Sequence, residues 1–308
     1  MTVQIGLALS GGGAKGIAHV GVLKVLEETQ IPVHMLAGTS MGGIVAAVYA
    51  AGRSPSEIER IFRSLRLLDI LQRDRTGLGL LGQGKIAARL REALGGDLTF
   101  DQLRLPLALV AVDLETGEEV VIREGSVIEG LLATSAVPIL FPPVRRRGQL
   151  LIDGGILNLV PFDVARQMGA DRVIAVYTVH DPLSEMGAET TAGGRGAEAV
   201  VRMVLRRAPW APIVEVAERS SNIASRRLIE QRMRQTPPDV MIEVTLKGVG
   251  LLDLDQADAA LKAGEAAARQ HLPELLDLCD TSLPKRWARW WRSLRPAISR
   301  FTLHSKDV

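Results

Sequence analysis

Residues 38–42 read GTSMG, a G-x-S-x-G pattern centred on Ser40 with an apolar stretch on each side. Residues 32–37 predict a short buried strand, and residues 44–51 predict a helix that ends at Gly52. A serine at such a strand-to-helix turn is lifted clear of the sheet and can act as a nucleophile. A glycine-rich turn whose serine only caps the helix gives the same short pattern, so other residues must decide between the two.

A second glycine-rich stretch, SGGGAKG at residues 10–16, lies between a predicted strand (5–9) and a predicted helix (17–28). Free backbone N–H groups in such a loop can hold an anion. The dinucleotide-binding fingerprint fits formally, but it requires an acidic residue about 20 residues later, and that strand here runs into Ser40 instead. The phosphate-binding P-loop fails because Lys15 precedes its glycine. We expect an oxyanion hole at Gly11, Gly12 and Gly13, with a purely structural turn as the alternative.

Two aspartates follow predicted strands. Asp153 directly follows the predicted strand at 149–152 and precedes two glycines. It is therefore either a turn residue or a catalytic carboxylate at the same sheet edge as Ser40. Asp113 follows residues 107–112, and for it a turn-capping role is the preferred interpretation.

Strands alternate with helices along the chain, and most strands are continuous apolar stretches. Predicted strands cover residues 5–9, 32–37, 107–112, 118–123, 149–152, 172–179 and 239–246; predicted helices cover 17–28, 44–51, 54–66, 85–94, 126–135, 197–207, 213–234 and 256–270. This order predicts an α/β fold with three layers, α/β/α, around a mostly parallel sheet. Ligands then bind beyond the carboxyl ends of the strands, where the glycine loop and Ser40 are expected. Residues 77–82 suit either a flap over the site or a packed surface loop.

The bulk composition sets the class of protein. With 308 residues, 47% of them hydrophobic and 23% charged, the chain is long and apolar enough for a folded enzyme. Its single cysteine, Cys279, excludes an internal disulfide framework and favours a reducing cytoplasm. No signal-peptide pattern follows Met1, and no apolar stretch approaches the roughly 18 residues of a membrane span. We therefore expect a cytoplasmic protein whose membrane contact, if any, is peripheral and on the inner face.

The net charge of +2 conceals a basic C-terminal tail. Residues 281–308 carry seven Lys or Arg and one Asp, together with three of the four tryptophans. We therefore divide the chain into a domain at 1–280 and a tail at 281–308. Aromatic and aliphatic residues of the tail recur at three- and four-residue steps, which predicts an amphipathic helix at an anionic membrane surface. Packing on the domain itself is the alternative, and nucleic acid is not expected as a partner.

These motifs together resemble the patatin-like phospholipase family, the bacterial relatives of plant patatins and of the neuropathy target esterase catalytic domain. The resemblance is carried by residues 10–16, 38–42 and 153–155, supported by ATSAVP at 133–138 and NLVP at 158–161, and it covers roughly residues 4–275. It implies a three-layer α/β/α fold, a Ser40/Asp153 dyad and an oxyanion hole in the glycine loop. The tail lies outside the family pattern.

The implied chemistry is acyl transfer from a carboxylic ester, with Asp153 as base for Ser40. An aspartate of ordinary pKa is a weak base, so the dyad requires a desolvated carboxylate, and an acyl chain filling an apolar site would provide it. A lipid or other ester is therefore the expected substrate.

Two alternatives remain open. His180 follows a predicted strand and could complete a Ser-Asp-His triad. A membrane-surface adaptor that uses only the tail is a non-catalytic alternative, although it would have no need of Ser40 and Asp153 together. The other histidines, His19, His34, His271 and His304, lack metal-ligand spacing, and we expect neither a metal nor a cofactor.

Overall fold

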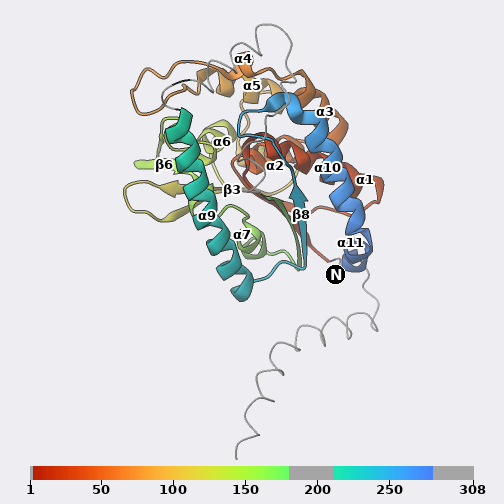
Figure 1. Cartoon of the computed structure of the whole chain (residues 1–308). Helices are drawn as coiled ribbons and strands as arrows, with labels where there is room; N and C mark the ends of the chain where they lie inside the picture. Colours follow the sequence, from red (N-terminus) through yellow and green to blue (C-terminus); the bar gives the residue numbers. More distant parts are fainter. Residues whose placement is uncertain (1–2, 180–207, 209–210, 280–308) are drawn as a thin grey trace, which may run out of the picture.

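One mixed sheet of eight strands forms the centre of the computed structural model, which describes residues 3–179, 208 and 211–279 (Figure 1). The strands are β1 (Ile5–Leu9), β2 (Met35–Thr39), β3 (Leu107–Asp113), β4 (Glu119–Ile122), β5 (Val144–Arg146), β6 (Gln149–Asp153), β7 (Arg172–Val179) and β8 (Val240–Thr245). Their order is β5-β6-β3-β2-β1-β7-β8, with β4 also paired to β3. Strands β1, β2, β3, β7 and β8 are parallel, whereas β4, β5 and β6 pair in antiparallel fashion.

The helices cover both faces of this sheet. They are α1 (Ala18–Glu28), α2 (Met41–Ala50), α3 (Pro55–Ser64), α4 (Leu67–Ile70), α5 (Gly84–Leu94), α6 (Val127–Thr134), α7 (Phe162–Gln167), α9 (Ala211–Gln235), α10 (Ala257–Gln270) and α11 (Leu272–Cys279), with short 3-10 helices at Gly13–Ile17, Phe100–Gln102, Gly154–Ile156 and Leu254–Gln256. None of the helices in the described ranges is long and apolar enough to span a bilayer.

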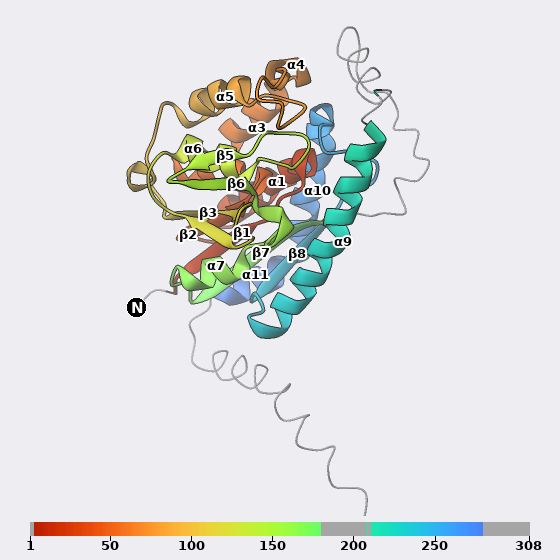
Figure 2. The same ribbon diagram turned by 90° about the vertical axis from the view of Figure 1, so that its left-hand side faces the viewer.

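Alternation along the strands divides the core into two layers. Large side chains such as Leu7, Leu36 and Leu109 face α1, α2 and α10, while the intervening Ala8 and Ala37 face α7 and α9. Figure 2 shows α9 lying along the outside of the sheet beside β7 and β8. The three-layer α/β/α architecture with a mostly parallel sheet is therefore confirmed.

Several element boundaries agree with the sequence predictions, and others do not. β1 and β7 have the predicted bounds, and Ser54 caps α3 through a capping box with Glu57. β2 starts at Met35 rather than at Pro32, and α2 begins directly after Ser40 rather than at residue 44. The predicted helix at 197–207 lies outside the described residues, as does the tail.

Four elements, β5, α4, α7 and α11, were missed in the sequence because each is short. β5 forms a hairpin with β6 through Arg147 and Gly148, which both have positive φ, 49° and 84°. Helix α7 has only six residues and α11 only eight, too few for a clear apolar period.

One edge of β3 is shared by two strands that approach each other end to end. Thr39 of β2 pairs with Val110, and Asp153 of β6 pairs with the next residue, Ala111. Because β4 also pairs with Val110 and Ala111, it occupies the opposite edge, and β2 and β6 must lie in line. Their carboxyl ends therefore meet at one point of the sheet.

Candidate active site

Ser40 stands at the turn between β2 and α2 in a strained backbone conformation. Its φ of 53° and ψ of −125° are rare for a residue with a side chain, and such strain persists only where the surroundings enforce it. A Cβ on Gly42 would collide with the carbonyl oxygens of Leu9 and Ser10, so glycine is required for the turn to close against β1. The predicted strand-turn-helix position of Ser40 is therefore observed.

Thr134, the last residue of α6, holds the turn in place. The Ser40 N–H donates to Thr134 Oγ1 at 2.9 Å, and the Thr134 hydroxyl donates to the Val110 carbonyl of β3. The sequence indicated Thr134 only as part of the ATSAVP segment and did not predict this role. A buried threonine at the end of an apolar helix, directly before a proline-rich segment, was the available signal.

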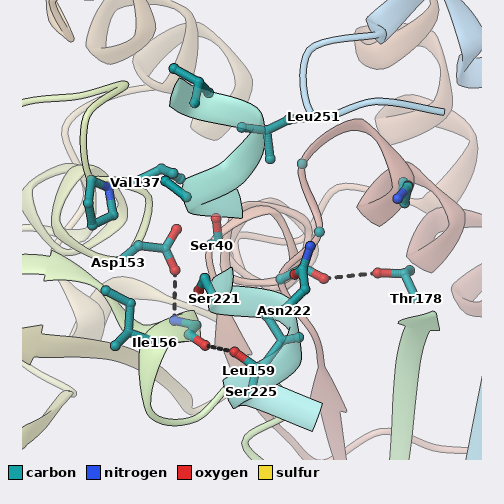
Figure 3. A pocket seen from close by; sticks show the side chains of 18 of the residues that line it. Ser40, Val137, Asp153, Ile156, Leu159, Thr178, Ser221, Asn222, Ser225 and Leu251 are labelled. Atoms are coloured by element: carbon teal, nitrogen blue, oxygen red, sulfur yellow. Dashed lines mark hydrogen bonds between the residues drawn. The ribbon is translucent and has the colours of Figure 1, made fainter. Parts of the chain in front are cut away.

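Asp153 ends β6 with its carboxylate directed toward Ser40 (Figure 3). The same ATSAVP segment positions it, since the Asp153 N–H donates to the Ala136 carbonyl at 3.0 Å. Its Oδ1 accepts the Gly155 N–H at 2.7 Å. One carboxylate oxygen is thus held by the backbone of the Asp-Gly-Gly turn.

Burial changes the acidity of this carboxyl. Desolvation raises the pKa of Asp153 to about 6 from its ordinary value of 3.8, while hydrogen bonds from the Ser40 side chain and the Gly155 N–H partly oppose the rise. The residue is only 6% exposed. The carboxylate is therefore a stronger base than a solvated aspartate.

The glycine-rich loop lies against Ser40 and offers two free amides. Gly11 lines the site, but its N–H already donates to the Leu159 carbonyl at 3.0 Å. Gly12 and Gly13 have positive φ, 141° and 56°, and their N–H groups have no acceptor among the described residues. The N–H groups of Gly12 and Gly13 can therefore donate to an oxyanion, whereas the Gly11 N–H cannot. This differs from the sequence prediction, which assigned all three glycines to the oxyanion hole.

A pocket of about 210 Å³ joins these groups. Its walls bring together Ser40, Asp153 and the glycine loop with mainly apolar side chains: Val137, Pro138, Ile156, Leu159, Val214, Ala217 and Leu251. Residues 77–82 are not among those that line it; Leu80 and Leu81 instead bond to the backbone at Ile139 and Leu140, as in a packed surface loop.

Helix α9 forms one wall of the pocket, which the sequence analysis did not predict. Its inner face contributes Val214, Ala217, Ser221, Asn222 and Ser225. The Ser225 hydroxyl donates to the Gly155 carbonyl at 2.6 Å, next to Asp153. At its other end Arg232 forms ion pairs with Glu119 and Asp163. The small-residue spacing at 217, 221 and 225 was a weak signal for this contact.

Asp113 does not belong to the site. Its Oδ1 accepts the Glu115 N–H at 3.1 Å, as the turn-capping interpretation predicts, and Oδ2 accepts from the Gln149 amide.

None of the described histidines contacts the dyad. His19 bonds to the Ser10 carbonyl, His34 to the Ile5 N–H and His271 to the Ala267 carbonyl. His180 and His304 lie outside the described residues. Across the described ranges there is also no cluster of side chains that could hold a metal ion.

Comparisons with known proteins find related sequences and a related fold. A family model described as patatin-like phospholipase matches residues 7–166, a range that contains the glycine loop, Ser40 and Asp153. An uncharacterised NTE family protein of Mycobacterium tuberculosis is 30% identical over 279 residues, covering 89% of this chain and 47% of the relative. Patatin-like phospholipase domain-containing protein 6 of Mus musculus is 32% identical over 238 residues, covering 75% of this chain and 17% of that protein.

The chain thus spans about half the length, or less, of these curated relatives. Among solved structures, that of VipD from Legionella pneumophila matches with a TM-score of 0.53 at 16% identity, covering 90% of this chain and 67% of that chain. At that identity the likeness concerns the fold alone.

Proposed function

This chain belongs to the patatin-like phospholipase family, and we propose that it is a serine hydrolase of carboxylic esters in phospholipids or related lipids. In this proposal Ser40 is the nucleophile, Asp153 the general base, and the N–H groups of Gly12 and Gly13 the oxyanion hole. The supporting observation is a buried carboxylate directed at a strained serine in an apolar pocket. A phospholipase A or lysophospholipase reaction would use this arrangement.

The reaction proceeds through an acyl-enzyme. Asp153 accepts the Ser40 proton on the oxygen that Gly155 does not hold, as Ser40 Oγ bonds to the ester carbonyl carbon. The carbonyl oxygen becomes an oxyanion and accepts hydrogen bonds from Gly12 and Gly13. The ester bond then breaks, and the alcohol leaves with the proton from Asp153. Water attacks the acyl-enzyme by the same steps, so the mechanism requires no histidine.

The pocket wall favours a lipid substrate over a polar ester. An acyl chain against Val137, Leu159 and Leu251 would displace water from the side of the site where Asp153 lies. Excluding water keeps the carboxylate basic and strengthens the hydrogen bonds to the oxyanion. Substrate binding and base strength are therefore coupled in this mechanism.

Hydrolysis of p-nitrophenyl esters of increasing chain length by the purified protein tests the proposal. We expect turnover that Ser40→Ala abolishes, and covalent labelling of Ser40 by a fluorophosphonate. Ser221→Ala is the matched control, because Ser221 lines the same pocket on α9 and should leave most activity. An inactive wild-type protein, or a Ser40→Ala variant with full turnover, would refute the assignment.

The tail at 281–308 supplies a second part of the proposal, namely attachment to an anionic membrane. Its composition combines seven basic residues with three tryptophans, as in segments that bind the headgroup region. A cytoplasmic protein held in this way would meet its lipid substrate on the inner membrane face.

A further inference from the structure

A buried polar cluster packs against the glycine-rich loop, and one of its members, Thr178, also lines the pocket. It consists of Ser10, Thr178 and His19, which are at most 3% exposed. The Thr178 and Ser10 hydroxyls each donate to the Gly11 carbonyl at 2.9 Å (Figure 3 draws the Thr178 bond), and the Thr178 N–H donates to Ser10 Oγ at 3.0 Å. Both lone pairs of one carbonyl oxygen are thus engaged by side chains.

We infer that Thr178 and Ser10 are positioning residues for the oxyanion hole, holding the Gly11–Gly12 peptide so that the Gly12 N–H is directed at the oxyanion. The inference rests on the proposed function. The Gly11 carbonyl and the Gly12 N–H belong to one planar trans peptide, so their bonds point in opposite directions. Anchoring the carbonyl toward Thr178 therefore turns the N–H away from Thr178.

The next peptide of the loop is held in the same way. The Gly12 carbonyl accepts the Lys15 N–H at 3.2 Å, and this directs the Gly13 N–H to the opposite side. The two free amides of the loop thus follow two consecutive carbonyls that are both bonded. Of the two anchors, only the one at Gly11 depends on side chains.

Glycine backbone makes such an anchor necessary. Without side chains at Gly11 and Gly12, rotation of the intervening peptide is little restricted, and a flipped peptide would present a carbonyl oxygen to the developing negative charge. His19 supports the anchored form through its bond to the Ser10 carbonyl. Because the Ser10 carbonyl can only accept, His19 Nε2 is the donor of their 2.7 Å bond. Burial lowers the pKa of His19 to about 4, so the ring stays neutral at neutral pH.

Substituting Gly11 or Gly12 would not test the positioning role of Thr178 and Ser10. A Cβ on Gly12 would collide with Thr178 Oγ1, and the substituted residue would have to adopt a φ of 141°. Any loss of activity could therefore reflect damage to the loop. The test instead uses Thr178→Val, which keeps the side-chain volume and removes the donor. Thr178→Ser keeps the donor. Thr29→Val is the matched control, because the Thr29 hydroxyl also donates to a backbone carbonyl, that of Val25, far from the site.

We expect Thr178→Val to lower kcat for a short-chain p-nitrophenyl ester about 10-fold with KM unchanged, since one of the two hydroxyl donors to the Gly11 carbonyl is lost. Adding Ser10→Ala should bring the loss to the roughly 10²-fold typical of a missing oxyanion donor. Thr178→Ser should restore most turnover. A trifluoromethyl ketone, which forms an anionic tetrahedral adduct with the serine, should bind less tightly by the same factor as kcat/KM falls. Affinity for the product fatty acid should not change.

Wild-type turnover in Thr178→Val, or equal losses in Thr178→Val and Thr178→Ser, would overturn the inference. Unchanged ketone affinity alongside reduced kcat would also overturn it. If Thr178→Val fails to fold, Ser10→Ala alone tests the second donor to the same carbonyl with the same readouts. Failure of the proposed function would give a different result from failure of this inference. In that case Ser40→Ala, in an otherwise wild-type chain, would not reduce turnover.

Discussion

Thr39 and Asp153 occupy consecutive positions along one edge of β3, opposite Val110 and Ala111. Thr39 precedes Ser40, so the serine and the carboxylate meet where β2 and β6 approach each other end to end. β3 is buried along its whole length. The separation of the proposed dyad is therefore set by the hydrogen-bond register of a central strand rather than by a surface loop, which is the rigid placement that a two-residue catalytic unit requires.

The first prediction distinguishes the dyad from a triad that uses His180. Asp153→Asn should lower kcat/KM for a short-chain ester by roughly 10³-fold, within the range for loss of a general base. His180→Ala should retain most activity, because the carboxylate acts on Ser40 directly. Comparable losses of several orders of magnitude in both variants would favour the triad.

The second prediction concerns the pH dependence of the reaction. Only the ionised form of Asp153 can accept the Ser40 proton, and burial raises the pKa of this carboxyl to about 6. The value of kcat/KM should therefore rise tenfold per pH unit below about pH 6 and level off above it. An inflection near pH 4 would instead indicate a solvated base.

The third prediction concerns how the raised pKa of Asp153 makes the stability of the protein depend on pH. The native state binds the Asp153 proton more tightly than the unfolded chain, so the free energy of unfolding falls as pH rises from about 4 to 6. Above pH 6, where Asp153 is ionised in both states, the free energy of unfolding is lower than below pH 4 by about 3 kcal/mol. Asp153→Asn should therefore be more stable than wild type at pH 8, and by a smaller margin at pH 5.

Urea unfolding at the two pH values measures this difference. Asp101→Asn, at an exposed aspartate, is the control and should show no such pH-dependent gain. An Asp153→Asn variant less stable than wild type at pH 8 would mean that the carboxylate is a stabilising group, contrary to the prediction.

The sequence predicted those parts of the site that depend on local patterns. Ser40 and the glycine loop each lie between an apolar strand and a helix, so local rules for turns and helix starts place them at the carboxyl edge of the sheet. The parallel core was predictable for the same reason, since β1, β3 and β7 are continuous apolar stretches.

The parts that were missed depend on contacts between segments far apart in the chain. The bond from Ser40 to Thr134 spans 94 residues, and that from Ser225 to Gly155 spans 70. Hydrophobic period carries no information on such pairs. The hydrogen bond from the Gly11 N–H to the Leu159 carbonyl could not be predicted from the sequence either. It depends on how the segment after the Asp-Gly-Gly turn folds back onto the end of β1.

The fourth prediction tests the support of the serine turn by Thr134. Thr134→Val removes the acceptor of the Ser40 N–H and leaves a buried donor unsatisfied, which should lower the free energy of unfolding by about 1–3 kcal/mol. Turnover should fall because the strained Ser40 backbone loses its constraint. Thr134→Ser should restore both properties, and a Val variant with wild-type stability and rate would show that the turn needs no such support.

The last prediction concerns the tail at 281–308 and its proposed attachment to membranes. Each basic residue near an anionic surface contributes on the order of 1 kcal/mol, so the tail's seven could hold the protein there, and salt should weaken the attachment. Truncation after Ser282 should abolish co-sedimentation with anionic vesicles and leave the hydrolysis of a water-soluble ester unchanged. Zwitterionic vesicles are the control for the charge contribution. If the truncated protein still binds anionic vesicles as strongly as the full chain, the attachment resides in the domain and the proposed role of the tail is wrong.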